Sequence, residues 1–310
     1  MKFKFAMGLL ATTFLLTVCR ENFGQKGDLS TAKAADANSE APSKPIDTGL
    51  HVLTCGHSFH SFFITPILKN MADRAGIKGH EIVGVSKIPG SKAIAHWEVP
   101  DAKNEAKAAL REGKVDVLTL TCMLQPDEGI EKFATLGLEH NPNFRVSLQE
   151  SWLPWDKFEW PLKGSEDVID FNAATFPNLR EKHEPYFKGM DDYVVELNKK
   201  LGKQVVFVAP CGQALLSLRE KIIAGQAPGL AKQSDLFTDK NGHPHPPLEA
   251  LVGYVHFGVL YRRSPVGLPL PEVLAKTKKP EWGDKLNRLL QELAWDAVIH
   301  QPLSGVTEKN

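Results

Sequence analysis

From residue 51 onward, short apolar runs alternate with segments of helical period, and this alternation limits the possible folds more than any other feature of the chain. The apolar runs, rich in β-branched residues, cover residues 51–55, 81–86, 115–121, 144–149 and 204–209. Apolar residues recur at helical spacing in residues 62–75, 186–201, 248–261 and 280–300. Strands that alternate with helices predict an α/β fold, in which about five parallel strands are covered by helices on both faces.

The first residues have the pattern of an export signal. Lys2 and Lys4 flank the start of an apolar run that extends from residue 5 to residue 18 and is followed by Cys19. The run is short for a membrane-spanning helix, so we expect it to be cleaved rather than to anchor the chain. The segment before Cys19 loosely resembles a bacterial lipobox. Val18 is larger than the small residue expected there, so a lipoprotein signal is the less favoured alternative.

The sequence predicts three parts: a signal over residues 1–19, a flexible tether over 20–46 and one domain over 47–310. The tether is rich in Ser, Ala, Lys and Asp and has few large apolar residues. We expect an exported protein that is periplasmic or extracellular. We expect contact with the membrane only if Cys19 carries a lipid or the signal is not cleaved. The 37 basic and 37 acidic residues balance, which argues against a nucleic-acid partner.

Residues 151–180 interrupt the alternation. They contain three tryptophans, three phenylalanines and three prolines, and they have no clear period. Long loops of this kind in compact domains are usually functional. The segment follows the fourth expected strand, so Trp152, Trp155 and Trp160 are candidates for stacking on sugar or acyl groups of a substrate. An equally weighted alternative is a hydrophobic cluster that seals the edge of the sheet.

Ser58 stands where the first expected strand ends, just after Gly56. The carboxyl ends of parallel strands border the crevice in which such folds bind ligands. Ser58 is therefore a candidate nucleophile, provided that other parts of the chain supply a base and an oxyanion site.

The segment Asp239-Lys-Asn-Gly-His243-Pro-His245 supplies the best base among the eleven histidines. Each proline holds the preceding histidine extended, and the segment leads into the apolar helix expected over residues 248–261. An acid and a histidine locked together on one loop satisfy the need to orient a general base. His243 is preferred to His245 because it lies nearer to Asp239, and Asp235 is the weaker candidate for the acid.

These segments together resemble the SGNH, or GDSL-type, hydrolases. Members carry a Gly-Asp-Ser-(Leu/Phe) block after the first strand and an Asp-x-x-His block near the C-terminus, in a flavodoxin-like, three-layer α/β/α sandwich. Gly56-His57-Ser58-Phe59 is similar to the first block with His57 in place of Asp, and Asp239 to His243 is similar to the last block with one additional residue. Residues 255–269 are similar to SGNH-like proteins of polysaccharide-degrading bacteria. The resemblance covers about residues 51–269.

The resemblance also implies an oxyanion site. Gly90 matches the position of a family glycine whose backbone N–H binds the oxyanion, although a plain turn glycine is an equally weighted alternative. After the third strand the family has Gly-x-Asn-Asp, whereas this chain has Cys122-Met-Leu-Gln125-Pro. The amide of Gln125 is the candidate replacement for the asparagine. Loss of one oxyanion donor lowers a rate by about 10²–10³, so this departure bears on activity.

The implied activity is that of a serine esterase that needs no cofactor and no metal. His243 takes the proton of Ser58, Asp239 holds the imidazole, and the N–H groups of Ser58 and Gly90, with Gln125, stabilise the oxyanion. The expected substrates are small-molecule or glycan esters, with acetyl or other acyl groups on carbohydrates favoured by the export signal and the aromatic segment.

Two other classes of function stay open. The first is a carbohydrate-binding protein that keeps the sandwich but has little or no turnover, which the altered third block permits. The second is a metal-dependent hydrolase that uses His57, His60, His243 and His245 as ligands. The histidines of His-Pro-His do not share a face, which makes the metal site the weaker alternative.

Overall fold

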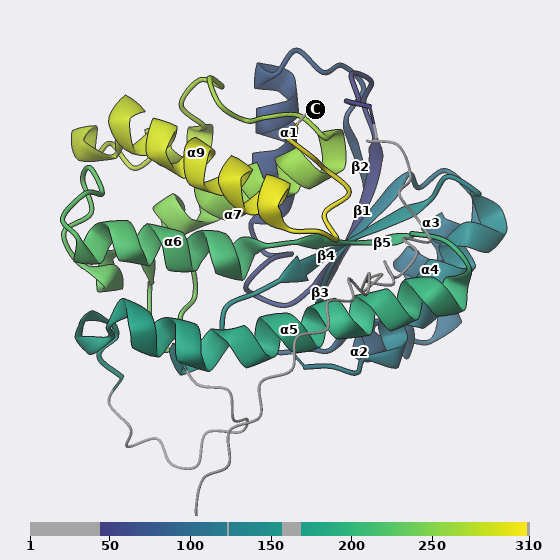
Figure 1. Cartoon of the computed structure of the whole chain (residues 1–310). Coiled ribbons are helices and arrows are strands. Elements are labelled where there is room, and N and C mark those ends of the chain that lie inside the picture. The colour runs from purple at the N-terminus through teal and green to yellow at the C-terminus, as the bar shows by residue number, and fades with distance from the viewer. Residues whose placement is uncertain (1–43, 123, 157–168, 309–310) are drawn as a thin grey trace, which may run out of the picture. The chain divides into compact units, whose positions relative to one another are not determined.

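Five strands form one parallel sheet in the order β2-β1-β3-β4-β5 (Figure 1). The computed structural model describes residues 44–122, 124–156 and 169–308. The strands are β1 (His51–Gly56), β2 (Glu81–Lys87), β3 (Val117–Cys122), β4 (Arg145–Glu150) and β5 (Val206–Ala209). Every neighbouring pair is parallel. The fold class and the strands predicted from the sequence are confirmed.

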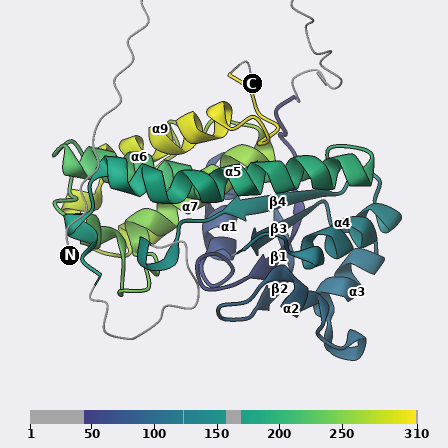
Figure 2. The ribbon, with the colours of Figure 1, turned by 60° about the horizontal axis from the view of Figure 1, so that its bottom comes forward.

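Helices cover both faces of the sheet and complete the three-layer α/β/α arrangement (Figures 1 and 2). One face carries α1 (Ile64–Arg74), α6 (Cys211–Ile223), α7 (Pro246–Tyr261) and α9 (Asp284–His300), with the short α8 (Glu272–Ala275) beside α1 and α7. The other face carries α2 (Ala93–Trp97), α3 (Glu105–Arg111), α4 (Glu128–His140) and α5 (Phe176–Leu201).

Side chains from opposite faces of β1, β3 and β5 enter two separate hydrophobic clusters. In β1, Val52 packs in the cluster with α1, α7 and α9, whereas Leu53 and Cys55 pack in the cluster with α3, α4 and α5. Burial on both faces explains why the strands read as nearly continuous apolar runs rather than as alternating ones. Cys55 and Cys211 are buried free thiols within these clusters.

The helix α5 begins ten residues before its expected start at residue 186. Pro185 lies inside the helix, although a proline removes one helical hydrogen bond. The helix starts after Thr175, whose hydroxyl accepts a hydrogen bond from the Asn178 amide at 3.5 Å. The segment 151–180 was expected to lack a period, but its last residues, 176–180, therefore form the start of α5.

The expected signal and most of the expected tether lie outside the described residues, so export and lipid attachment stay predictions. Ile46 precedes β1 in the described part of the chain, and its amide donates a hydrogen bond to the Tyr261 carbonyl at 2.8 Å. Over the described ranges, no helix combines the length and the apolar character that crossing a membrane requires.

Candidate active site

Ser58 lies in a turn between β1 and α1, at the carboxyl edge of the sheet. The turn is fixed by Ser61, whose amide donates to the His57 carbonyl at 3.1 Å and whose hydroxyl donates to the Gly56 carbonyl at 2.5 Å. Gly56 is sterically required, because a Cβ atom there would lie 2.4 Å from Thr121 Oγ1 on β3. The turn thus packs directly on the neighbouring strand and leaves Ser58 half-buried.

Ser58, His243 and Asp239 form a hydrogen-bonded chain. Ser58 Oγ lies 2.7 Å from His243 Nε2, and His243 Nδ1 lies 2.6 Å from Asp239 Oδ2. An ionised Asp239 accepts only, so Nδ1 carries the proton and Nε2 is free to accept the proton of the Ser58 hydroxyl. The structure therefore brings together the three residues that the sequence analysis selected as nucleophile, base and acid.

Asp239 also organises the loop that carries His243. Its Oδ1 accepts hydrogen bonds from the amides of Asn241, Gly242 and His243 at 2.9, 3.2 and 3.2 Å. Partial burial alone would raise the pKa of Asp239, but the hydrogen bonds from the His243 ring, the His243 amide and the Asn241 amide outweigh it and lower the pKa below its usual value. Gly242 has φ +90°, a conformation that favours glycine. The loop thus keeps the acid ionised and aimed at the histidine.

The weaker candidates for acid and base have other partners. Asp235 Oδ2 accepts the amides of Ala231 and Lys232 at 3.0 Å each, within the turn around η4 (Gln233–Leu236). His245 Nδ1 lies 3.1 Å from the Asp235 carbonyl oxygen. Both residues fix the chain just before α7, and neither takes part in the hydrogen-bonded chain at Ser58.

Trp152 lies under the His243 loop. Its ring stacks on Phe59 at a centroid distance of 4.8 Å, and its Nε1 donates to the Gly242 carbonyl at 3.0 Å. Phe59 in turn meets the His243 ring edge-on at 5.3 Å. Trp152 is only 2% exposed, so it has no free face for a sugar. The prediction that Trp152 stacks on a substrate is therefore wrong, and its ring instead packs against the loop that carries His243.

The other two tryptophans of the aromatic segment differ from Trp152. Trp155 is partly exposed and has φ 55° within the 3₁₀ turn η2 (Pro154–Asp156). A bulky residue in this left-handed region is uncommon and is found more often at functional sites. Contact between Trp155 and a substrate stays a prediction, and Trp160 lies outside the described residues.

We expect Trp152→Phe to lower the rate of ester hydrolysis about tenfold, because it removes a hydrogen bond worth about 0.5–1.5 kcal/mol from the loop that positions the base. The matched control is Trp282→Phe, which also loses an indole hydrogen bond, at 3.0 Å to the Gly229 carbonyl. That bond is not made to the His243 loop, so activity should stay near wild type. Steady-state hydrolysis of p-nitrophenyl acetate makes the comparison, and equal losses in both variants would refute the supporting role.

A buried ion pair anchors the segment that follows Trp152. The Arg219 guanidinium on α6 donates to both carboxylate oxygens of Asp156, at 2.5 and 2.9 Å, and to Gln233 Oε1 at 2.7 Å. Its central carbon lies 5.8 and 5.7 Å from the ring centres of Phe171 and Phe237. Arg219 is fully buried. It therefore ties the aromatic segment to the turn that precedes the His243 loop.

We expect Arg219→Met to lower the free energy of unfolding by about 3–5 kcal/mol, because the carboxylate of Asp156 is then buried without a partner. The control is Arg288→Met, which breaks an exposed pair with Glu292 on α9 and should change stability by less than about 1 kcal/mol. Urea denaturation followed by tryptophan fluorescence measures both. Similar small losses in the two variants would show that the buried pair contributes little.

The two backbone donors expected at the oxyanion site lie on neighbouring loops. The Ile88 amide donates to the Gly56 carbonyl at 3.3 Å, so the loop that contains Gly90 begins beside the Ser58 turn. Gly90 is exposed and has φ +59°, and a Cβ there would meet no atom within 4 Å. Conformation rather than crowding therefore favours glycine. Within the described residues, the N–H groups of Ser58 and Gly90 have no acceptor and stay available.

His96 holds the Gly90 loop against the end of β2. Its Nδ1 lies 2.6 Å from Ser86 Oγ and its Nε2 lies 2.8 Å from Ser91 Oγ. Burial lowers the pKa of His96 to about 4, so the ring is neutral near pH 7. This role of His96 was not predicted from the sequence, in which Gly90-Ser91 followed by His96 is the only signal of it.

Gln125, the candidate replacement for the family asparagine, lies against α5. Its Oε1 is 3.8 Å from the position that a Cβ of Gly189 would occupy. Its Nε2 is buried and has no hydrogen-bond partner within the part of the chain that the structure describes. Among the described residues, no hydrogen bond links Gln125 to Ser58, so its role as an oxyanion donor stays a prediction.

His57, which stands where the family has aspartate, is buried and brings no negative charge to the site. Its Nδ1 accepts the Phe59 amide at 3.3 Å. Burial, with smaller contributions from His96 and His243, lowers the pKa of His57 to about 4. His57 therefore stays neutral near pH 7.

The four histidines of the metal alternative do not converge on one point. Both nitrogens of His243 are engaged by Ser58 and Asp239, and His245 bonds to the Asp235 carbonyl. Among the described residues, no group of three or more His, Cys, Asp or Glu side chains has the arrangement of a metal site. The hydrogen bonds of His243 thus favour a role as base over a role as ligand.

Comparison with known proteins bears on the fold. No protein-family model matches the chain, and no curated protein matches it. A solved structure described as a DUF4886 family protein from Bacteroides uniformis is similar with a TM-score of 0.51 and 16% identity, over 84% of this chain and 98% of that one. A "putative GDSL-like lipase" from Parabacteroides merdae is similar at a TM-score of 0.42 and 12% identity, over 69% of this chain and 95% of that one. The first similarity supports the α/β/α fold and does not extend to function.

Proposed function

We propose that this chain is a serine esterase that hydrolyses carboxylic esters through an acyl-enzyme on Ser58. The observation that carries the proposal is the hydrogen-bonded chain from Ser58 Oγ to His243 at 2.7 Å and on to Asp239 at 2.6 Å. A serine hydroxyl is a weak nucleophile and needs such a base, oriented by a third group. The resemblance of both segments to SGNH hydrolases supports the same interpretation.

In the proposed mechanism, His243 Nε2 takes the proton of Ser58 as Oγ attacks the ester carbonyl carbon. The carbonyl oxygen becomes an oxyanion, which the free N–H groups of Ser58 and Gly90 stabilise. The tetrahedral intermediate then collapses and releases the alcohol, which takes its proton from His243. Water attacks the acyl group with His243 again as base, and the acid leaves. Asp239 keeps Nδ1 protonated throughout.

Acyl groups on carbohydrates, acetyl groups above all, are the proposed substrates. The expected export signal and the aromatic segment with the partly exposed Trp155 support this choice. The test is release of acetate from chemically acetylated xylan and of p-nitrophenol from the acetate, butyrate and octanoate esters. We expect acetate release and a preference for the short ester. No hydrolysis of any of these esters would refute the proposed activity, and turnover of octanoate alone would refute the substrate class.

A second candidate is a carbohydrate-binding protein of the same fold with little turnover. The altered third block favours it, because Gln125 stands where the family has asparagine and its Nε2 is buried without a hydrogen-bond partner among the described residues. Affinity electrophoresis in acetylated xylan separates the two functions. Retardation of both wild type and Ser58→Ala, with no acetate released by either, would favour binding alone.

A further inference from the structure

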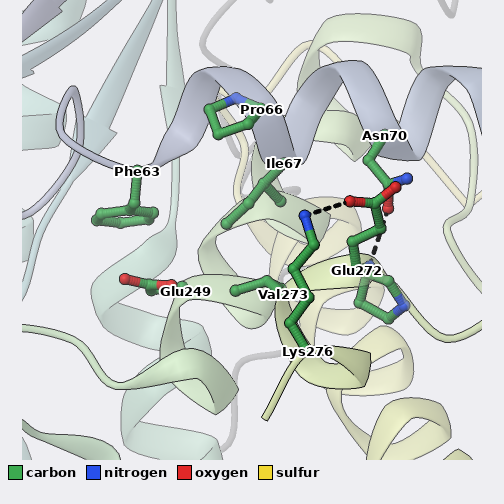
Figure 3. Close-up of a pocket in the computed structure, with 9 residues that line it drawn as sticks. Phe63, Pro66, Ile67, Asn70, Glu249, Glu272, Val273 and Lys276 are labelled. Carbon is green, nitrogen blue, oxygen red and sulfur yellow. Dashed lines mark hydrogen bonds and ion pairs between the residues drawn. The ribbon is translucent and has the colours of Figure 1, made fainter.

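A cavity of about 220 Å³ lies between α1, α7 and α8 (Figure 3). Phe63, Pro66 and Ile67 form its α1 side, and Val273 of α8 lies across from them. None of the residues that line it belongs to the chain of hydrogen bonds at Ser58. Its volume corresponds to about seven water molecules in the liquid. The cavity is thus large enough for a small organic molecule.

Three charged side chains line this cavity, and two of them neutralise each other. Lys276 Nζ and Glu272 Oε2, both from the α8 segment, are 2.6 Å apart. Glu249, in the first turn of α7, lies beside Phe63 at the other end of the cavity. Within the described residues its carboxylate has no hydrogen bond and no ion pair. The unbalanced charge of the lining is therefore the single negative charge of Glu249.

The surroundings of Glu249 do not favour its charged form. Burial raises the pKa of this carboxyl to about 7. The α1 side of the cavity contributes only the neutral Asn70 besides apolar residues, and the α8 segment contributes the Glu272–Lys276 pair. The other elements packed on α7 contribute no residue to the lining. The fold thus places a partly buried carboxylate at an apolar cavity without a protein side chain as its counter-charge, so the carboxylate is open to a cationic ligand.

We propose that this cavity binds a small organic ammonium ion with a short apolar body, such as a protonated alkylamine. The Phe63 ring and the Glu249 carboxylate lie at the same end and both attract a cation. The side chains of Pro66, Ile67 and Val273 cover the alkyl chain. An anion would be repelled by Glu249, and a neutral ligand would leave it unpaired. The site does not depend on the proposed chemistry at Ser58.

Titration of the full chain with n-butylammonium, followed by protein NMR shifts, tests the proposal. A primary alkylamine is protonated throughout, since its pKa is close to the value of about 10.4 found for lysine. Glu249 is ionised above its pKa and loses its charge as the pH falls below about 7. The affinity near pH 8.5 should therefore exceed that near pH 5.5 by at least about tenfold. Neutral n-butanol should bind at least about tenfold more weakly than the amine at the higher pH.

Two variants of the same cavity sharpen the test. Glu249→Gln should weaken n-butylammonium binding by at least about tenfold, whereas Glu272→Gln, which alters a carboxylate already paired with Lys276, should change it by less than about threefold. Ser58→Ala should bind the amine as wild type does, so failure of the esterase proposal would not affect this result. The proposal is overturned by no binding near pH 8.5, by equal affinity at the two pH values, or by unchanged binding in a folded Glu249→Gln. If Glu249→Gln does not fold, the pH dependence of the wild type decides alone.

Discussion

Replacement of Ser58 by alanine is expected to lower kcat/KM for p-nitrophenyl acetate by at least about 10³-fold, because it removes the proposed nucleophile. Among the described residues, the hydroxyl has one hydrogen-bond partner, His243 Nε2 at 2.7 Å, so its loss leaves the neighbouring turn intact. Ser58 is only half-buried, and the midpoint of thermal unfolding should stay within a few degrees of wild type. A stable but inactive variant is the result that identifies a catalytic group rather than a structural one.

Ser61→Ala is the matched control for this variant. Ser61 belongs to the same turn, but its hydroxyl donates to the Gly56 carbonyl and is buried. Its loss should cost stability of about 1 kcal/mol and lower activity by less than about tenfold. If Ser58→Ala keeps activity near wild type, Ser58 is not the nucleophile. If Ser61→Ala is equally inactive at full stability, the loss in Ser58→Ala does not distinguish the nucleophile from its turn.

Asp239→Asn is expected to lower kcat by about 10³–10⁴, with little change in KM. An asparagine amide can donate a hydrogen bond to His243 Nδ1, which would place the ring proton on Nε2. That tautomer cannot accept the proton of Ser58. The carbonyl oxygen of asparagine can still accept the loop amides that Asp239 Oδ1 accepts now, so the loop should keep its conformation.

The control for this second variant is Asp235→Asn, which changes the nearby carboxylate that only accepts the amides of Ala231 and Lys232. Its kcat should stay within about threefold of wild type. Equal losses in the two variants, or no loss in Asp239→Asn, would show that Asp239 does not orient the base. Steady-state kinetics on one ester, with unfolding curves for both proteins, makes the comparison.

The features that could be predicted from the sequence are those carried by local pattern. The five strands follow from apolar runs, which are largely buried except in the edge strand β2, and Ser58 was placed at the edge of the sheet because β1 ends at Gly56. Asp239 and His243 are four residues apart, so their contact depends on one short loop. The hydrogen bond from Ser58 to His243 joins residues that are 185 positions apart in the chain. It could be predicted only because both segments resemble blocks of a known family.

The features that could not be predicted depend on side-chain direction and on distant pairing. Trp152 follows β4 as expected, but nothing in its local sequence shows that the ring turns under Gly242 rather than outward. The Arg219–Asp156 pair joins residues 63 apart in the chain without a motif at either end. The cavity at Glu249 exists because α1, α7 and α8 meet there. The sequence of each helix alone shows only the apolar pattern of a helix that packs on a core.

The most direct measurement is the site at which an alkyl fluorophosphonate labels the wild-type protein, identified by mass spectrometry of proteolytic peptides. The reagent bonds to an activated serine Oγ with loss of fluoride, and the reaction needs a base to take the serine proton. If His243 activates Ser58, the reagent should label the wild-type protein at one residue, Ser58. The His243→Ala variant should carry almost no label. Active protein that carries no label on Ser58, or equal labelling of Ser58 in His243→Ala, would contradict the proposed serine esterase.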